Sequence, residues 1–141
     1  MNIYNLNDAI RIGSLYKTKY KNNQDVGCLF KVVNEMKELN NMVGLETFKQ
    51  NVIDHILSSC QKFNDDNMQH TVLTGPPGVG KTTIARILAK IYHKCGLVST
   101  SKFVVARRNE LIGQYLGETA IKTTAKFRSA NKGVLFIDEA Y

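Results

Sequence analysis

The sequence predicts a layered α/β fold with a parallel sheet, preceded by a helical segment. From about residue 71 onward, short β-prone runs alternate with segments whose apolar residues recur at helical spacing, a pattern typical of parallel sheets covered by helices. The residues before that point show only helical periodicity. A chain of 141 residues with 43% hydrophobic content is long enough for one such core and short for two independent domains.

The N-terminal segment is expected to be helical and separable from the rest of the chain. Asn7 or Asp8 can cap a first helix that reaches about residue 20, with Ile10, Gly13, Tyr16 and Tyr20 at helical spacing. A second helix is expected from residue 25 to about 39, with an apolar stripe of Val26, Leu29, Val32, Val33, Met36 and Leu39. We therefore expect a helical segment over residues 1–38 and an α/β domain over residues 39–141.

The α/β domain is expected to begin with a helix and then to alternate. A third helix is expected from about residue 45 to 63, with one apolar face formed by Phe48, Val52, Ile56, Cys60 and Phe63. Residues 71–74 predict a strand, and residues 82–93 predict a helix with Ile84, Ile87, Leu88 and Ile91 inward. Residues 103–106 predict a second strand, residues 119–129 a helix, and residues 134–137 a third, fully apolar strand.

Between the first strand and its helix the chain reads GPPGVGKTT. Gly75, Gly80, Lys81 and Thr82 meet the pattern G-x-x-x-x-G-K-T of a phosphate-binding loop. The glycines let amides turn toward phosphate oxygens, Lys81 can reach the β- and γ-phosphates, and the Thr82 hydroxyl can bind Mg²⁺. The sequence therefore predicts a nucleotide site formed by Gly75, Pro76, Pro77, Gly78, Val79, Gly80, Lys81, Thr82 and Thr83.

Two acids come directly after the last apolar strand. Asp138 and Glu139 are expected at the carboxyl edge of the sheet, where open α/β folds bind ligands. One acid can hold the magnesium together with Thr82, and its neighbour can orient a water toward the γ-phosphate. The alternative, a strand that exits into solvent through two acids, requires two independent motifs to coincide by chance.

These motifs resemble a known family. GPPGVGKTT and LFIDEAY are similar to the Walker A and Walker B motifs of AAA+ ATPases, and ELIGQYLGETAIKT resembles the group of red-type rubisco activases and stage V sporulation protein K. The resemblance runs from about residue 39 to residue 141. It implies the three-layer α/β/α fold of P-loop NTPases, with the second and third strands side by side and a later, fourth strand between the third and the first.

The resemblance also implies roles for individual residues. Val43 and Gly44 would line the adenine pocket, Asp138 would coordinate the magnesium, and Glu139, with Lys81, would be catalytic. Tyr115, Leu116 and Gly117 fall where the family carries a pore loop that grips a polypeptide in the channel of a ring. The implied activity is ATP hydrolysis with ATP and Mg²⁺, coupled to chaperone-like remodelling or threading of a protein substrate by a homo-oligomer, a hexamer when the protein is complete.

Other interpretations stay open. The net charge of +7, with Arg107 and Arg108, also suits an AAA+ protein that acts on nucleic acid, such as a loader or a helicase-like protein. A third interpretation is a fragment that binds nucleotide without turnover, because the sequence stops at Tyr141, before the sensors, arginine finger and lid of the family. On that basis the isolated chain is expected to be marginally stable, with weak or no hydrolysis.

Cysteine usage and hydropathy indicate the compartment. Cys28, Cys60 and Cys95 are odd in number and widely spaced, which favours a reducing environment. No apolar run reaches the length of a membrane span, and the N-terminus lacks the layout of a signal peptide. We expect an intracellular, cytoplasmic protein with no membrane partner.

Overall fold

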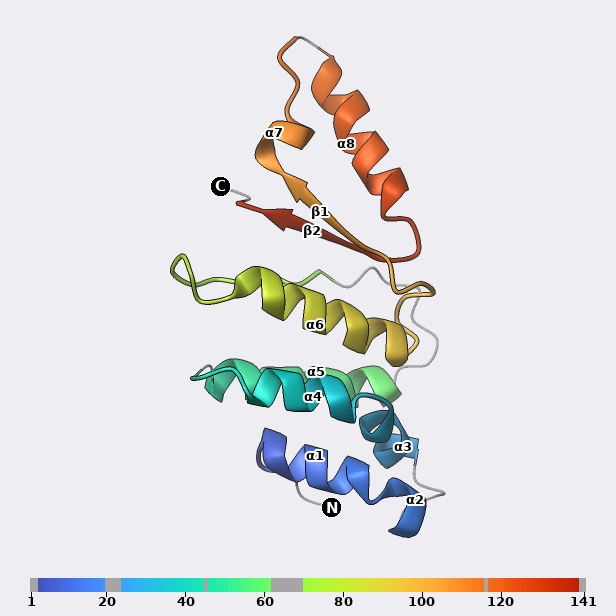
Figure 1. The fold of residues 1–141 in the computed structure, drawn as a ribbon. Helices are drawn as coiled ribbons and strands as arrows, with labels where there is room; N and C mark the ends of the chain where they lie inside the picture. The colour runs from blue at the N-terminus through green and yellow to red at the C-terminus, as the bar shows by residue number, and fades with distance from the viewer. Residues whose placement is uncertain (1–2, 20–23, 45, 62–69, 116, 140–141) are drawn as a thin grey trace. The chain divides into compact units, whose positions relative to one another are not determined.

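A computed structural model describes residues 3–19, 24–44, 46–61, 70–115 and 117–139 (Figure 1). The chain forms two compact units, residues 1–72 and residues 73–141. Within the described residues, no helix has both the length and the apolar character to cross a membrane.

The first unit is helical. Its helices are α1 (Leu6–Ser14), α2 (Tyr16–Lys19), α3 (Gln24–Lys31), α4 (Val33–Asn40) and α5 (Glu46–Gln61). The cap of α1 is Asn5, whose Oδ1 accepts a hydrogen bond from the Asp8 N–H at 2.9 Å. The prediction that Asn7 or Asp8 caps this helix was wrong, because both residues lie inside its first turn.

Two helices predicted as continuous are interrupted. Leu15 separates α1 from α2, and Val32, with φ −111° and ψ 11°, separates α3 from α4. At the first break the Leu15 N–H donates hydrogen bonds to the carbonyl oxygens of both Arg11 and Ile12. Hydrophobic periodicity did not reveal either break, because a one-residue interruption leaves the apolar spacing on both sides nearly unchanged.

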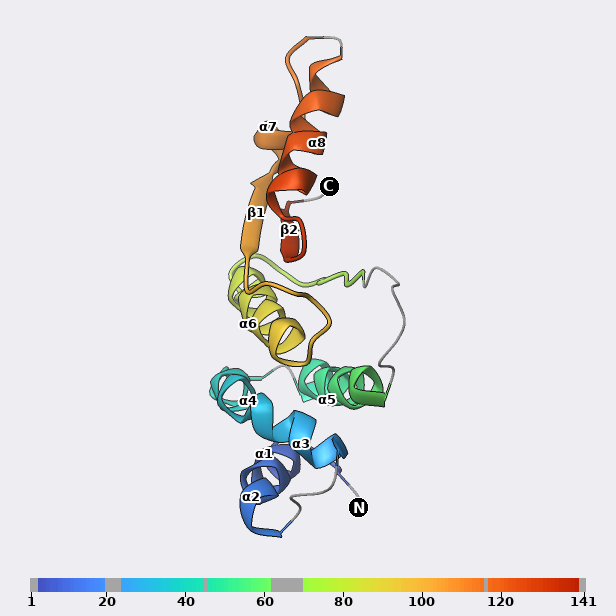
Figure 2. The same cartoon turned by 90° about the vertical axis from the view of Figure 1, so that its right-hand side faces the viewer.

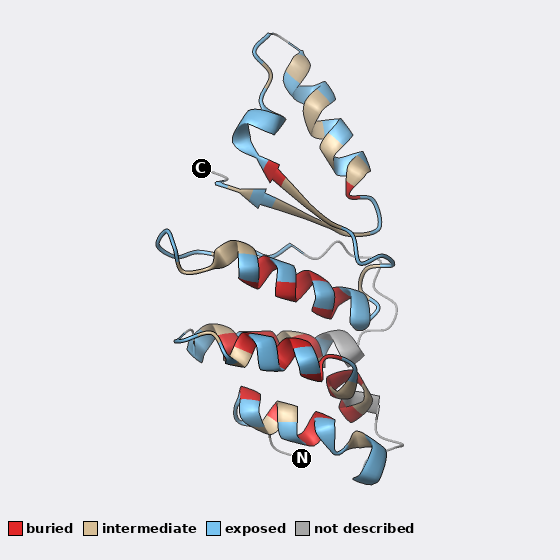
Figure 3. Cartoon of the chain, in the orientation of Figure 1, coloured by how far each residue is buried: buried red, intermediate tan, exposed pale blue. Residues whose placement is uncertain are grey.

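The core of the first unit matches most of the predicted apolar stripes. All six residues of the stripe from Val26 to Leu39 are buried, as are Val52 and Ile56 of α5. Figure 3 shows the buried parts of these helices in red. In α1 the buried residues are Leu6, Ala9, Ile12 and Gly13. Of the stripe predicted there, Gly13 is buried, while Ile10 and Tyr16 are only half-buried. Tyr20 and Phe63, and the side chain of Cys60, lie outside the described part of the chain.

Shortening a side chain at the centre of this core should destabilise the first unit strongly. Leu29 is fully buried, so we expect Leu29→Ala to lower the free energy of unfolding by about 2–5 kcal/mol. Urea unfolding followed by circular dichroism measures this change. Val43→Ala is the matched control, because Val43 is 98% exposed and should change stability by less than about 0.5 kcal/mol. Equal losses in the two variants would contradict this description of the core.

The second unit contains the sheet. Its elements are α6 (Lys81–Lys94), β1 (Phe103–Arg107), α7 (Arg108–Leu111), α8 (Glu118–Ser129) and β2 (Val134–Asp138). β1 and β2 pair in parallel, in a register that runs from Phe103 opposite Val134 to Arg107 opposite Asp138. The expectation that the strands at residues 103 and 134 are neighbours is therefore confirmed.

Helices cover the sheet of the second unit on two sides. In Figures 1 and 2 the strands lie between α6 and α8. The Arg86 guanidinium of α6 lies 5.6 Å from the centre of the Phe103 ring, and Phe103 stacks on Phe136 across the two strands. All four predicted inward residues of α6, Ile84, Ile87, Leu88 and Ile91, are buried. The predicted α/β class, with helix, parallel sheet and helix in layers, is confirmed.

The strand predicted over residues 71–74 does not form. Both described strands pair only with each other, and Val72 is 84% exposed. A β-strand is completed by hydrogen bonds to a neighbour, so β-prone residues alone do not make one. The prediction of a strand over residues 71–74 was therefore wrong.

Candidate nucleotide site

The glycine loop enters α6 through left-handed backbone. Gly78 has φ 82° and Gly80 has φ 85°, a region that costs residues with a side chain about 1–2 kcal/mol. A Cβ built on Gly78 would meet no atom within 4 Å, so the backbone angle, rather than crowding, favours glycine there. Such a turn can present successive amides to an anion, which is the chemistry predicted for the loop.

The N-terminus of α6 lies at the end of this loop. Gly80 is its N-cap and, as a glycine, provides no side-chain cap, and the first turn of α6 contains no acidic residue. The amides of Lys81, Thr82 and Thr83 have no carbonyl partner within the helix, as in the first turn of any α-helix. Together with the helix dipole, these amides make a region of positive potential that suits phosphate.

Lys81 folds back onto the loop that precedes it. Its Nζ donates hydrogen bonds to the carbonyl oxygens of Gly75 and Pro76, both at 2.9 Å. The ammonium group is therefore held at the loop itself. A phosphate oxygen would be a stronger partner for it than either carbonyl, because the hydrogen bond would then join two charged groups.

The other loop residues differ in exposure. Gly75, Pro76, Pro77 and Gly78 are exposed, Val79, Gly80, Lys81 and Thr82 are half-buried, and Thr83 is exposed. The burial of Ile84 and Ala85 directly after Thr83 fixes which face of α6 points inward. The individual contacts of these residues with a nucleotide stay predictions.

Asp138 and Glu139 lie at the carboxyl end of the sheet. Asp138 is the last residue of β2 and Glu139 comes next with φ 56°, an uncommon angle for a residue other than glycine. Strained backbone of this kind costs about 1–3 kcal/mol and clusters at functional sites. In Figure 1 the carboxyl end of β2 and the N-terminal end of α6 lie on the same side of the second unit. A magnesium shared by Thr82 and Asp138 requires this arrangement, and those ligand roles stay predictions.

Tyr115 lies in the connection between α7 and α8. Its side chain is 74% exposed, which excludes an ordinary packed tyrosine. Gly117, with φ 89°, is the N-cap of α8, and Leu116 lies outside the described residues. The exposed ring suits contact with another molecule, but the pore-loop role stays a prediction.

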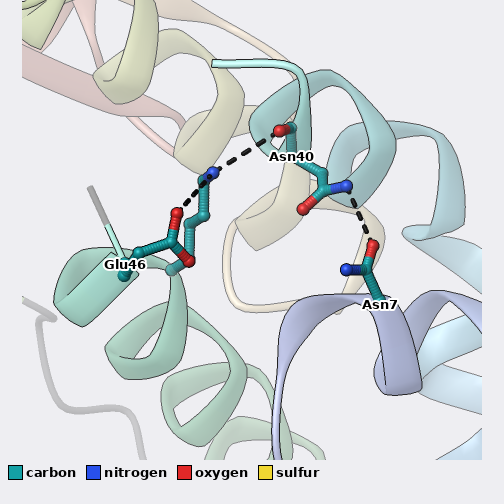
Figure 4. Close-up of polar contacts among 4 residues, drawn as sticks. Asn7, Asn40 and Glu46 are labelled. Atoms are coloured by element: carbon teal, nitrogen blue, oxygen red, sulfur yellow. Dashed lines mark hydrogen bonds and ion pairs between the residues drawn. The ribbon is translucent and has the colours of Figure 1, made fainter. Parts of the chain in front are cut away.

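The predicted adenine-pocket residues belong to the first unit. Val43 is 98% exposed, and Gly44 has φ 75° in the turn between α4 and α5. Polar contacts surround this turn (Figure 4): the buried Lys49 donates to the Asn40 carbonyl and to Glu46 Oε1, both at 3.4 Å, and Asn40 donates to Asn7 Oδ1 at 3.0 Å. These contacts tie α5, α4 and α1 together. The contact of Val43 with adenine stays a prediction.

Sequence reasoning missed the polar residues that hold the Tyr115 segment. Glu118 and Thr119, at the start of α8, accept hydrogen bonds from the amides of Gln114 and Gly113. A signal was present in the sequence, because Thr119, Thr123 and Lys126 recur at helical spacing. Polar residues at that spacing ordinarily indicate a solvated face, so the pattern drew no functional interpretation.

The loop, the helix after it and the layered parallel sheet together define a class, the P-loop nucleotide-binding α/β proteins. Within that class, a family model described as "ATPase family associated with various cellular activities (AAA)" matches residues 71–141. The chain belongs to this family.

Three relatives show the range of proteins that this chain resembles. The ESX-3 secretion system protein EccA3 of Mycobacterium tuberculosis is 56% identical over 72 residues, which cover 51% of this chain and 11% of EccA3. The rubisco activase of Cyanidioschyzon merolae is 36% identical over 108 residues, or 71% of this chain and 37% of the activase. Stage V sporulation protein K of Bacillus subtilis is 35% identical over 113 residues, or 74% of this chain and 35% of that protein.

These matches confirm the resemblance to the rubisco activase and sporulation protein K group. The chain spans about a tenth of EccA3 and about a third of each of the other two relatives.

Proposed function

We propose that this chain binds ATP with Mg²⁺ through residues 75–83 and contributes ATP hydrolysis to the remodelling or threading of proteins by a ring of copies. One observation carries the proposal: a left-handed glycine loop runs directly into the uncapped N-terminus of α6, with the Lys81 ammonium held at the loop. That combination suits an anion such as the phosphates of a nucleotide.

Different residues of the chain would bind the phosphates, hold the metal and orient the attacking water. The loop amides and Lys81 would bind the β- and γ-phosphates, while Thr82 and Asp138 would hold the metal. Mg²⁺, when bound, neutralises the charge that develops on the phosphates. Glu139, beyond the end of β2, would orient a water for attack on the γ-phosphate. Lys81 and Glu139 are the residues we propose as catalytic.

Tyr115 is proposed to contact the substrate polypeptide. An exposed aromatic ring on a short connection between two helices can bind an unfolded chain without selecting its sequence. One relative is named an activase of ribulose bisphosphate carboxylase/oxygenase, so its name describes action on a protein. A protein substrate is therefore the partner we propose for this chain.

Removing the Tyr115 ring should weaken polypeptide binding. We expect Tyr115→Ala to lower the affinity for fluorescein-labelled casein, an unfolded protein, by about tenfold, measured by fluorescence anisotropy in the presence of a slowly hydrolysed ATP analogue. Tyr4→Ala is the matched control, because Tyr4 is also an exposed tyrosine, at 71% compared with 74% for Tyr115. Unchanged casein binding by Tyr115→Ala would count against the proposed role of this residue.

The variant Tyr115→Ala also distinguishes the proposed action on proteins from the alternative of action on nucleic acid. Arg107 and Arg108 are both exposed at the end of β1, which is the observation that favours this alternative. Binding of a single-stranded oligonucleotide that falls steeply between about 50 and about 200 mM salt, and that survives Tyr115→Ala, would favour a protein that acts on nucleic acid.

A further inference from the structure

α8 contacts the rest of the second unit through polar side chains rather than through a buried apolar face. None of its residues is buried (Figure 3). Ile121 is 72% exposed. The half-buried residues of the helix are Glu118, Lys122, Thr123, Lys126 and Ser129, all of them polar. An amphipathic helix on a sheet ordinarily turns its apolar side inward, so this arrangement needs an explanation.

The explanation is a row of contacts to α7 and to the segment after it. Thr119, Thr123 and Lys126 lie on one face of α8, since they are four and then three residues apart. Thr119 Oγ1 accepts from the Gly113 N–H at 3.0 Å, Thr123 Oγ1 donates to the Leu111 carbonyl at 3.3 Å, and Lys126 pairs with Glu110. Here we call the contacts made by Thr119, Thr123, Lys126 and Glu118 the polar seam.

The end of the polar seam that lies away from Tyr115, at Lys126 and Glu110, is fixed to the sheet. Glu110 Oε2 accepts from the backbone N–H of Arg107, the last residue of β1, at 2.9 Å, while Oε1 accepts from Lys126. The Lys126 hydrogen bond and the Arg107 amide hold the pKa of the Glu110 carboxyl below its ordinary value. Glu110 therefore stays ionised at neutral pH, and this end of the seam keeps its charge pair.

The other end of the polar seam, at Glu118 and Thr119, holds the residues directly before Tyr115. Glu118 Oε2 accepts from the Gln114 N–H at 3.0 Å and is steadied by Lys122, whose Nζ lies 3.7 Å away. Gly113 is pressed against the same helix, since a Cβ there would lie 2.3 Å from Glu118 Cβ and 2.8 Å from Thr119 N. Two consecutive amides and one close backbone approach thus define the path of the chain into Tyr115.

Neither Glu118 nor Thr119 uses its side chain to cap α8, the helix to which both belong. The N-cap of α8 is Gly117, which as a glycine provides no side-chain cap. Glu118 and Thr119 instead direct their acceptors backward, to the segment that carries the exposed tyrosine.

We propose that Glu118 and Thr119 are positioning residues: by accepting hydrogen bonds from the amides of Gln114 and Gly113, they fix the backbone that presents Tyr115 to a polypeptide. This inference rests on the proposed function of Tyr115. The ring itself makes the contact, and the polar seam determines where the ring is held relative to β1. Because a charged acceptor forms the stronger hydrogen bond, loss of Glu118 has the larger effect.

Amide hydrogen exchange, followed by NMR on the full chain, tests the hydrogen bonds directly. Thr119→Val keeps the shape of the side chain and removes the acceptor, so exchange at the Gly113 amide should become about tenfold faster, while Thr119→Ser should restore it. Glu118→Ala should do the same at Gln114. Thr124→Val is the matched control on the exposed side of α8 and should change neither amide.

Casein binding tests whether these bonds matter for Tyr115. Thr119→Val and Glu118→Ala should weaken the binding of labelled casein by about threefold to tenfold and leave ADP affinity within about twofold, because a small misplacement of a contact group is costly. Gly113→Ala should weaken casein binding as well, with Gly27→Ala in α3 as its control, since a Cβ there comes no closer than 3.4 Å to any atom.

Each outcome has a separate meaning. Unchanged exchange at Gly113 and Gln114, or casein binding as weak in Thr119→Ser as in Thr119→Val, overturns the positioning proposal. Faster exchange with unchanged casein affinity also overturns it, provided that Tyr115→Ala lowers that affinity. If Tyr115→Ala leaves casein binding unchanged, the proposed function of Tyr115 fails, and exchange still decides whether the polar seam fixes the segment.

Discussion

Lys81→Met is expected to lower the affinity of the chain for ATP with Mg²⁺, and for ADP, by about 100-fold or more. Lys81 supplies the one ammonium group of the GPPGVGKTT loop, and its Nζ already lies at the loop, 2.9 Å from two carbonyl oxygens. Loss of a charge-assisted hydrogen bond to phosphate removes about 1.5–3 kcal/mol, and more than one phosphate oxygen is within reach of such a group. Isothermal titration calorimetry measures the change.

Two further variants separate the charge of Lys81 from its position. Lys90→Met makes the same substitution at an exposed position of α6 and should leave nucleotide affinity within about twofold. Lys81→Arg keeps the positive charge but replaces a compact ammonium with a broad, planar group, so an intermediate loss is expected. If Lys81→Met binds nucleotide as well as Lys90→Met does, the phosphate-binding interpretation of the loop is wrong.

The second unit was predicted from sequence almost element by element. The strands at residues 103 and 134 and the helices after residues 81 and 118 lie within one or two residues of their predicted bounds. Each is long enough, and regular enough in its apolar spacing, for the pattern to determine its type. The short helix α7 was missed, because four residues are too few to show a helical period.

Features that depend on distant partners were not predictable in the same way. Residues 71–74 have the composition of a strand, but pairing decides whether a strand forms. The polar seam likewise depends on α8 meeting residues 110–114, which no local pattern reports. Asn5 was overlooked as the cap of α1, although Asn residues are favoured there, because Asn7 and Asp8 compete for the role in the sequence.

The candidate site was partly predictable for a chemical reason. A phosphate-binding loop is built from consecutive residues, so its spacing is visible in the sequence, and the positive φ angles of Gly78 and Gly80 agree with it. The left-handed backbone of Glu139 was not predictable, because no pattern places a glutamate at φ 56°. Lys132 has a similar left-handed backbone, at φ 63°, so the angle by itself does not assign a role to Glu139, and that role stays a prediction.

Glu139→Gln is expected to lower the rate of phosphate release by about 100-fold to 1000-fold, with ATP affinity unchanged within about twofold. The amide has the shape of the carboxylate but cannot accept the proton of an attacking water, and loss of such a group typically costs that much. Single-turnover hydrolysis of labelled ATP measures the rate. Glu38→Gln on α4 is the matched control, because Glu38 is an exposed glutamate in the first unit.

Glu139→Gly separates the carboxylate from the backbone that carries it. Glycine adopts φ 56° without strain, so this variant should be more stable than the wild-type chain by about 1 kcal/mol in urea unfolding, while its hydrolysis falls as far as that of Glu139→Gln. A residue kept for its side chain at a cost in stability would show this combination. If both variants hydrolyse ATP as fast as the wild-type chain, Glu139 does not orient the water. ATP turnover by the GPPGVGKTT loop together with the Asp138–Glu139 pair is then excluded.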